Sequence, residues 1–308
     1  MWNDTQLAEY NCNLCGLRND KVIFERPDGL RVVQCGNCGL VYVNPRPKDD
    51  LIPALYDSDY FTSPSSIGYD NYYSDEIRRA MLTASKRKLL LLREAGVTTF
   101  DRVLEVGCGT GEFCHVVKNI GRSVTGIDIS ESAIAEARSR YKDIPFRVGM
   151  IDDLDPEVKY DAVFAFEVIE HLPDPDAFFG KTYALLGEHG FLCVTTPSFE
   201  CAEYAGFENW IGFSTSLEHL YFFSRTTIGK YAAKHGMKVV SALYGGGKGL
   251  NSSEREESTR RLAVKSVLRS LHILGPLRLI RSSILPIKHD YQSREPRHNL
   301  FMVLRKEQ

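Results

Sequence analysis

The sequence predicts an α/β domain with a mostly parallel sheet, preceded by a separate cysteine-bearing segment. From residue 100 onward, strand-like apolar runs alternate with helical segments, which is typical of a parallel sheet with helices on both faces. Four of the eight cysteines fall within residues 12–38 in two CxxC pairs, whereas the other four are scattered among apolar neighbours. A chain of 308 residues is long enough for one large domain or for a domain with an appendage.

The composition is that of an ordinary globular protein. Hydrophobic residues make up 43% of the chain and charged residues 25%, which is enough to bury a sizeable core. The formal net charge of -2 argues against a protein that coats nucleic acid electrostatically. No run approaches the roughly 18 apolar residues that span a bilayer, and the N-terminal segment lacks the pattern of a secretory signal. We therefore expect a cytoplasmic protein.

Residues 1–44 contain the two cysteine pairs, CNLCG and CGNCG, with short β-prone runs between them. Nineteen residues separate the pairs, a spacing in the range of zinc sites that consist of four thiolates. Glycines after the second cysteine of each pair (Gly16 and Gly39) suit the tight turns of such a site. The alternative is four free cysteines. We predict a structural zinc ribbon with the ligands Cys12, Cys15, Cys35 and Cys38.

Residues 45–98 are predicted to be a linker, an aromatic segment and an N-terminal helix. The helix should run from about Asp75 to Ala95 and stop at Gly96. The aromatic residues before it either form a flap that closes over a pocket and excludes water, or simply pack against the helix. They are Tyr56, Tyr60, Phe61, Tyr69, Tyr72 and Tyr73.

The α/β domain is expected to occupy residues 99–308. Its predicted strands are Arg102–Val106, Ser123–Ile127, Phe146–Val148, Tyr160–Phe166, Gly190–Thr195, Met237–Leu243 and Asn299–Leu304, with helical segments between the first five. A basic, amphipathic helical insertion is predicted at residues 248–298, where eleven Lys and Arg face five Asp and Glu. This insertion either packs on the domain as a lid or contacts an anionic membrane or a lipid-linked substrate.

The stretch VLEVGCGTGEF, at residues 103–113, carries the clearest chemical signal. A buried strand delivers Glu105, and three glycines at alternate positions from Gly107 to Gly111 lead into a helix. Glycines permit a tight turn and the close approach of a ligand to the backbone. The dinucleotide fingerprint requires a third glycine where this chain has Glu112, whose carboxylate would repel a pyrophosphate. The carboxylate of Glu105 instead suits a ligand with an amino group.

A second acid follows at the end of the next strand, in GIDIS. Asp128 comes seventeen residues after Gly111, and a carboxylate at this place can accept hydrogen bonds from both hydroxyls of a ribose. An acid for an amino group, a glycine turn and an acid for a ribose together describe a nucleoside attached to an amino acid.

Five motifs resemble those of class I S-adenosylmethionine-dependent methyltransferases, in the branch of the ubiquinone-type O-methyltransferases: VLEVGCGTGEF, VTGIDIS, YDAVFAFEVIEHLPDP, GFLCVTTP and EHLYFFS. The resemblance covers residues 100–245 and implies a Rossmann-like seven-stranded sheet whose last strand is antiparallel. It also implies that the glycine loop (Gly107–Gly111) holds the methionine part of the cofactor. The implied cofactor-binding residues are Glu105, Gly107, Cys108, Gly109, Gly111, Asp128, Ile129, Ile151, Asp152 and Phe166.

Methyl transfer is an in-line displacement at a sulfonium methyl group, so the enzyme must orient a nucleophile and remove its proton. Histidine is the usual base because its pKa lies near the operating pH. The catalytic candidates are His171 after the fourth strand, His219 in SLEHLYFF after the fifth, and Glu167. Alternatively, each imidazole bonds a backbone carbonyl and orders a loop.

The segment EVIEH contains a further candidate site. Glu167, Glu170 and His171 occur at i, i+3 and i+4, so they would share one face of a helical turn. In the ubiquinone-type enzymes the corresponding segment is implicated in binding a divalent cation, and the resemblance therefore implies Mg²⁺ at these three residues. The alternative is that Glu167 faces the cofactor while Glu170 and His171 cap the following turn.

We predict a methyltransferase that acts on a small molecule, with a hydroxyl of a sugar or glycan precursor, including a lipid-linked one, as the acceptor. The four-cysteine module combined with this domain resembles part of the zinc-containing sugar methyltransferases. A second hypothesis is an RNA methyltransferase whose ribbon grips RNA, but four basic residues opposed by three acidic ones make the ribbon a poor phosphate surface. A third is a non-catalytic interaction protein that binds S-adenosylmethionine, against which the intact glycine loop and Asp128 argue.

Overall fold

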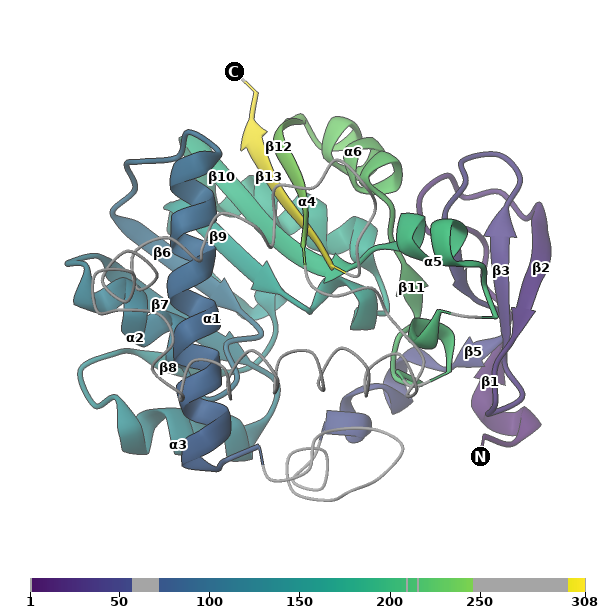
Figure 1. Ribbon diagram of the computed structural model, residues 1–308, viewed down its shortest axis with the longest axis horizontal. Helices are drawn as coiled ribbons and strands as arrows, with labels where there is room; N and C mark the ends of the chain where they lie inside the picture. Colours follow the sequence, from purple (N-terminus) through teal and green to yellow (C-terminus); the bar gives the residue numbers. More distant parts are fainter. Residues whose placement is uncertain (1, 57–71, 209, 215, 246–298, 308) are drawn as a thin grey trace, which may run out of the picture.

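A seven-stranded sheet forms the centre of the computed structural model, which describes residues 2–56, 72–208, 210–214, 216–245 and 299–307 (Figure 1). The strand order is β12-β13-β10-β9-β6-β7-β8. The strands are β6 (Arg102–Val106), β7 (Ser123–Asp128), β8 (Phe146–Val148), β9 (Tyr160–Phe166), β10 (Leu186–Pro197), β12 (Met237–Gly245) and β13 (Asn299–Lys306). β6 to β10 pair in parallel, whereas β13 is antiparallel to both of its neighbours. The predicted α/β class and all seven predicted strands are confirmed.

Six helices accompany the sheet in the described residues: α1 (Asp75–Glu94), α2 (Glu112–Asn119), α3 (Glu131–Arg140), α4 (Pro175–Leu185), α5 (Phe199–Ala205) and α6 (Arg225–Lys234). The N-terminal helix is confirmed, since the Ser74 side chain caps its first turn by accepting a hydrogen bond from the amide of Ile77. The expectation of a helix between every pair of the first five strands is wrong at one place. Between β8 and β9 there is only the 3-10 turn η5 (Ile151–Asp153). The Asp153 carboxylate accepts a hydrogen bond from the Met150 amide at 2.7 Å, which closes a single turn and competes with helix continuation.

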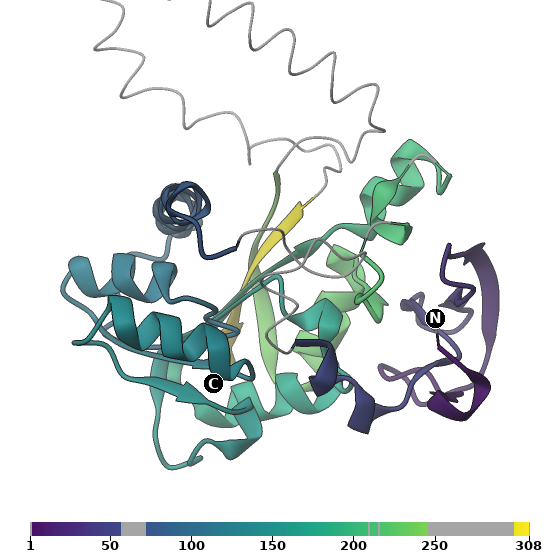
Figure 2. The same cartoon turned by 90° about the horizontal axis from the view of Figure 1, so that it is seen from below.

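The two faces of the sheet bury different layers because successive side chains of a strand point to opposite sides. Phe164 and Cys193 pack with residues of α1, α2 and α3, whereas Val163 and Val194 pack with residues of α4 and α6. Figure 2 shows α1, α2 and α3 at the opposite end of the molecule from the N-terminal segment. The carboxyl ends of β6, β7, β9 and β10 therefore meet at one edge between these layers, where α/β folds bind their ligands.

The N-terminal ribbon (residues 1–44) is joined to the α/β part through its sheet. Four strands lie in the order β11-β4-β3-β2, and a separate pair is formed by β1 and β5. These strands are β1 (Leu7–Ala8), β2 (Asp20–Glu25), β3 (Arg31–Cys35), β4 (Val41–Val43), β5 (Arg46–Pro47) and β11 (Tyr221–Phe222). β11 and β5 both come after residue 44, the predicted end of the ribbon, yet they pair with strands of the ribbon. The two parts therefore pack against each other across this predicted border. Leu14 and Tyr42 of the ribbon belong to the same hydrophobic core as α4 and α6.

Short 3-10 turns complete the described structure: η1 (Asp4–Gln6), η2 (Asp49–Leu51), η3 (Pro53–Tyr56), η6 (Ile169–His171) and η7 (Ile211–Phe213). Two predicted features lie outside the described residues, namely the insertion at 248–298 and three members of the aromatic group, Tyr60, Phe61 and Tyr69. Within the described ranges, no helix has both the length and the apolar character needed to cross a membrane.

Candidate active site

The glycine loop turns sharply between β6 and α2, with positive φ at all three glycines. A side chain at Gly107 would overlap the side chain of Val168, and one at Gly111 would lie 2.6 Å from the ring of Phe146. Both positions therefore require glycine for steric as well as conformational reasons. The contact with Val168 also places the segment after β9 directly against this loop.

Asp128, at the end of β7, holds the glycine loop through a hydrogen bond to its backbone. One carboxylate oxygen accepts a hydrogen bond from the Gly109 amide at 2.8 Å, and the other accepts one from the Ser130 amide at 2.9 Å. Burial raises the pKa of Asp128, whereas these amide hydrogen bonds lower it. The structure thus brings Asp128, the residue predicted to bind the ribose, together with the loop predicted to bind the methionine part.

Glu105 lies under the glycine loop and braces the start of α2. One of its carboxylate oxygens accepts hydrogen bonds from the Cys114 amide at 3.1 Å and the Cys114 thiol at 3.0 Å. The residue is only 5% exposed, and burial raises the pKa of Glu105 to about 8. Its contact with an amino group of the cofactor stays a prediction, since the carboxylate is already engaged by the protein.

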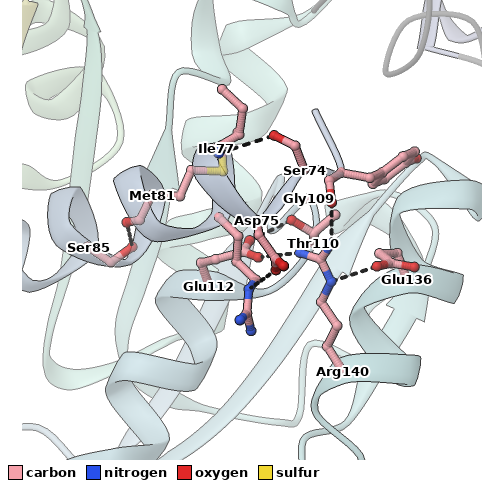
Figure 3. A network of polar contacts seen from close by, with 12 residues as sticks. Ser74, Asp75, Ile77, Met81, Ser85, Gly109, Thr110, Glu112, Glu136 and Arg140 are labelled. Atoms are coloured by element: carbon pink, nitrogen blue, oxygen red, sulfur yellow. Dashed lines mark hydrogen bonds and ion pairs between the residues drawn. The ribbon is translucent and has the colours of Figure 1, made fainter. Parts of the chain in front are cut away.

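The segment before α1 is anchored across α2 and α3 by Arg140, as Figure 3 shows. The guanidinium donates to the Tyr73 carbonyl at 2.8 Å and pairs with Glu112 at 3.0 Å and Glu136 at 2.6 Å. The Thr110 hydroxyl, within the glycine loop, donates to Glu112 at 2.5 Å. A chain of polar contacts therefore connects the loop to the residues that precede α1.

Tyr72 lies over the glycine loop as a result. Its hydroxyl would be 3.0 Å from a Cβ atom at Gly109, and the residue is 9% exposed. The neighbouring Tyr73 hydroxyl donates to Ser132 of α3 at 3.1 Å. Tyr72 also packs with Ile77 and Met81 of α1, so the contacts of Tyr72 include both a place over the loop and packing against the helix, and the flap stays a prediction.

Large apolar side chains remain exposed at the ends of β7 and β8. Ile129 is 38% exposed, Val148 43% and Met150 42%, and Val148 pairs with Asp128 across the two strands. Ile151, a predicted adenine contact, is instead 6% exposed and belongs to the hydrophobic core. An exposed apolar edge next to the predicted ribose ligand suits a flat aromatic base. The sequence pattern alone did not distinguish Met150 from its buried neighbour.

The predicted shared face of Glu167, Glu170 and His171 is wrong. Glu167 adopts a left-handed backbone with φ 56 between the end of β9 and the turn η6, so the three residues do not lie on one regular helical turn. Its carboxylate accepts a hydrogen bond from Asn299 at 3.4 Å, and burial raises its pKa. A positive φ at a non-glycine residue is uncommon and is frequent at functional sites.

Lys88 of α1 is a residue near this site that the sequence pattern did not reveal. Its ammonium lies 3.8 Å from the ring centroid of Phe166, a predicted cofactor contact. Burial lowers the pKa of Lys88, whereas the nearby carboxylates of Glu167 and Glu105 raise it. The only sequence signal was one lysine directly before four consecutive leucines in a helix.

The two histidine candidates lie side by side. The ring centroids of His171 and His219 are 4.7 Å apart with the planes at 79°. The Tyr56 hydroxyl is within hydrogen-bonding distance of His171 Nδ1, at 2.8 Å. Burial lowers the pKa of His171 to about 4, so its imidazole is neutral at physiological pH and is a weaker base than an ordinary histidine. His219 is 6% exposed.

Glu170, rather than Glu167, joins this histidine pair. Ligand atoms of Glu170, His171 and His219 lie within 4.8 Å of one another. Glu170 is fully buried, and burial together with the charge of Glu167 raises its pKa well above the ordinary value. Two imidazoles and one carboxylate do not suit Mg²⁺, which prefers oxygen ligands, so the residues present do not fit the magnesium ion that the resemblance implied.

The four cysteines of the ribbon come together as predicted from their spacing. All four sulfurs lie within 4.8 Å of one another, with Cys12 and Cys38 at 3.3 Å and Cys15 and Cys35 at 3.6 Å. Tetrahedral zinc with Zn–S distances of about 2.3 Å requires sulfurs roughly 3.8 Å apart. The donor set therefore fits zinc, and the four sulfurs lie close enough together for one ion to contact all of them.

Comparisons with known proteins identify the family of the α/β part of the chain. Residues 69–242 match the model of a protein family described as "Methyltransferase domain". The ubiquinone biosynthesis O-methyltransferase of Bradyrhizobium sp. (strain ORS 278) is 33% identical over 146 residues, which are 42% of this chain and 54% of that protein. A probable S-adenosylmethionine-dependent methyltransferase of Mycolicibacterium smegmatis is 36% identical over 97 residues, 31% of this chain and 38% of that protein. The chain thus spans about half the length, or less, of these curated relatives.

A solved structure extends the similarity of the fold. The crystal structure of magnesium protoporphyrin IX methyltransferase from Synechocystis PCC 6803 with bound S-adenosylmethionine superposes with a TM-score of 0.50. The match covers 86% of this chain and 100% of the other, at 15% sequence identity. At this identity the match concerns the fold alone.

Proposed function

Since this chain belongs to the class I S-adenosylmethionine-dependent methyltransferases, we propose that it transfers a methyl group from S-adenosylmethionine to a hydroxyl of a small molecule. The observation that carries the proposal is the pair of adjacent imidazoles, His171 and His219, at 4.7 Å. His171 follows Val168, which touches the glycine loop, and His219 contacts His171, so the candidate bases lie near the candidate cofactor loop.

The cofactor would lie along the carboxyl edge of β6, β7 and β8. In this placement the glycine loop holds the methionine part under Tyr72, and Asp128 accepts the ribose hydroxyls with the lone pairs that its amide partners leave. The exposed side chains of Ile129 and Met150 would contact the adenine ring. When bound, S-adenosylmethionine supplies an electrophilic methyl group on a sulfonium.

The imidazoles would remove the acceptor proton as the methyl group moves. The acceptor oxygen forms the new O–C bond while the S–C bond breaks, and the hydroxyl proton passes to a neutral imidazole. Tyr56 holds His171 through Nδ1, which leaves Nε2 for His219 or for the acceptor. Edge-to-face contact between the two rings would keep them oriented.

For the acceptor we retain a sugar hydroxyl as the first choice. An aliphatic hydroxyl is much less acidic than an imidazolium ion, so its methylation depends most strongly on a positioned base. An RNA acceptor has less support, because Arg26, one of the ribbon's four basic residues, is only 3% exposed and is therefore unavailable to phosphates.

The test is a methyl-transfer assay with S-adenosylmethionine labelled at its methyl group. The acceptors are a thymidine diphosphate sugar, protocatechuate and bulk transfer RNA, with the buffer supplemented by zinc. We expect label in the sugar, and a loss of about 100-fold in kcat for His171→Asn and His219→Asn, in line with removal of a general base. His189→Asn, at an exposed position, is the control. Full turnover in both active-site variants would refute the assignment of the two histidines as bases. Label in RNA alone would show that the acceptor is RNA and not a sugar.

The same assay tests whether methyl transfer requires a divalent cation. We expect EDTA, added briefly so that thiolate-bound zinc is retained, to leave turnover unchanged, because the donor set beside the acceptor does not suit Mg²⁺. Loss of turnover that Mg²⁺ restores would contradict this expectation.

A further inference from the structure

Arg26 is a buried arginine at the turn between β2 and β3 of the ribbon. Its side chain is 0% exposed and pairs with Asp28, with Nη2–Oδ2 at 2.5 Å and Nε–Oδ1 at 3.2 Å. Asp28 also accepts a hydrogen bond from the Leu30 amide at 3.2 Å. The turn therefore holds the guanidinium in one fixed orientation.

The other hydrogen bonds of this guanidinium go to backbone carbonyls outside the ribbon. Nη1 donates to the carbonyl of His219 at 2.9 Å, and Nη2 donates to the carbonyl of Leu217. A single planar fork thus holds the backbone on both sides of Glu218. Lysine cannot reproduce this arrangement, because its ammonium is a point charge without a planar fork.

The same backbone is tied down on its far side. The Leu220 amide donates to the Glu170 carbonyl at 2.8 Å, and the Leu220 carbonyl accepts from the Val43 amide at 2.8 Å. β11 then pairs with β4 of the ribbon, Tyr221 opposite Tyr42. His219 therefore lies in a short segment whose backbone bonds run to the ribbon and to η6.

The cysteine cluster lies at the other end of this hairpin. Glu25 pairs with Arg31 near the turn, whereas Asp20 pairs with Cys35 at the opposite end of the two strands. Four residues of strand correspond to roughly 13 Å. Arg26 consequently contacts the histidine segment from a place remote from the thiolates, and its role is separable from metal binding.

We propose that Arg26 is a positioning residue that sets the place of the His219 imidazole beside His171, so that the ribbon forms part of the acceptor site. The inference rests on the proposed function for the role of His219. Loops move unless they are tied down, and a displacement of about 1 Å at a catalytic group can cost on the order of 100-fold in rate. The fork of Arg26 supplies that restraint.

The experiment compares Arg26→Lys with Arg46→Lys in the full chain. Arg46 is an equally buried arginine (2% exposed) that pairs with Asp49 at 2.6 Å and donates to the Pro173 carbonyl at 3.0 Å. It also interacts with the Tyr221 side chain, but the carbonyls of Leu217 and His219 bond to Arg26. Both variants lose a fork and keep a charge. Imidazole signals are recorded by NMR on isotope-labelled histidine, with His219→Asn used for assignment.

In Arg26→Lys we expect the His219 signal to shift by more than its line width or to broaden, while the exposed His189 is unchanged. The affinity for S-adenosylmethionine, measured by calorimetry, should stay within about twofold, because the glycine loop does not contact Arg26. Arg46→Lys should leave the His219 signal in place. An unmoved His219 signal in folded Arg26→Lys protein would overturn the proposal.

Kinetics with any acceptor from the assay above provide a second readout. Arg26→Lys should lower kcat by about 100-fold without raising KM for S-adenosylmethionine, and it should cost nothing further in a His219→Asn background. Additive losses would instead indicate a merely structural arginine. Should Arg26→Lys fail to fold, Asp28→Asn keeps both carbonyl bonds of Arg26 and should give a smaller shift of the same signal; no shift would overturn the proposal. The NMR result needs no acceptor, so failure of the proposed function and failure of this inference are distinguishable.

Discussion

Two glycines that flank α2 offer a direct measurement of how tightly the glycine loop is packed. Gly111 precedes the helix with φ +84, and Gly121 follows it with φ +80. A Cβ atom at Gly121 would meet nothing within 4 Å, whereas one at Gly111 would lie 2.6 and 2.8 Å from two ring atoms of Phe146. Gly121→Ala therefore reports the backbone strain alone, and Gly111→Ala reports strain plus overlap.

The expected magnitudes follow from these two contributions. A left-handed alanine costs about 1–2 kcal/mol, and forcing an extra carbon into a packed core costs about 1–3 kcal/mol. The ring of Phe146 cannot easily move aside, because it is 4% exposed and also lies against Gly126, where a Cβ atom would be 2.7 Å from it. We expect a loss of about 1–2 kcal/mol for Gly121→Ala and about 2–5 kcal/mol for Gly111→Ala.

Urea unfolding measures the stabilities, and calorimetry with S-adenosylmethionine measures the cofactor site. Gly121→Ala should bind the cofactor like the wild type, whereas Gly111→Ala should bind at least about tenfold more weakly, since each 1.4 kcal/mol is a factor of ten. Equal losses of stability in the two variants would refute the packing argument. Unchanged cofactor affinity in Gly111→Ala would show that the loop does not hold the cofactor.

Three further predictions concern other parts of the site. Burial lowers the pKa of His171 from 6.5 to about 4, so between these values the unfolded chain binds a proton that the folded chain does not, and stability rises with pH. Between about pH 7 and 5 the wild type should therefore lose about 2 kcal/mol more unfolding free energy than His171→Asn, as measured by urea unfolding. An equal pH dependence of the unfolding free energy in the two proteins would contradict this. Asp128→Asn should weaken S-adenosylmethionine binding by about 10–100-fold in calorimetry, because a charged acceptor is lost; an unchanged affinity would exclude its ribose role. Cys35→Ser should abolish stoichiometric zinc in elemental analysis while Cys193→Ser, an equally buried control, retains it, and zinc retention by both would exclude the cluster.

The glycine turn could be predicted well because its signal is local. Glycines at alternate positions after a buried strand demand one kind of turn, and this turn is present from Gly107 to Gly111. Asp128 follows from the same logic one strand later. Ile151 and Met150 show the limit of such local reasoning: both are apolar neighbours, and only the packing of η5 decides that Ile151 is buried and Met150 exposed.

The histidine pair shows a different limit. His171 and His219 could each be nominated from a motif, but no sequence pattern stated that their rings meet or that Tyr56 bonds one of them. For EVIEH, the regular spacing predicted three residues on one face, whereas a single left-handed residue, Glu167, separates them. The spacing of residues in a sequence does not reveal an interruption of the backbone of this kind.

The sequence by itself determined the strands, the glycine turn, the cysteine spacing and the α/β class, because hydrophobic period and glycine or cysteine spacing are properties of neighbouring residues. Only the tertiary structure decided that β11 completes the ribbon's sheet and that Arg26 reaches the carbonyls of Leu217 and His219. These contacts join residues about 190 positions apart. Their geometry depends on strand order and on how the two parts pack, and no local pattern encodes either.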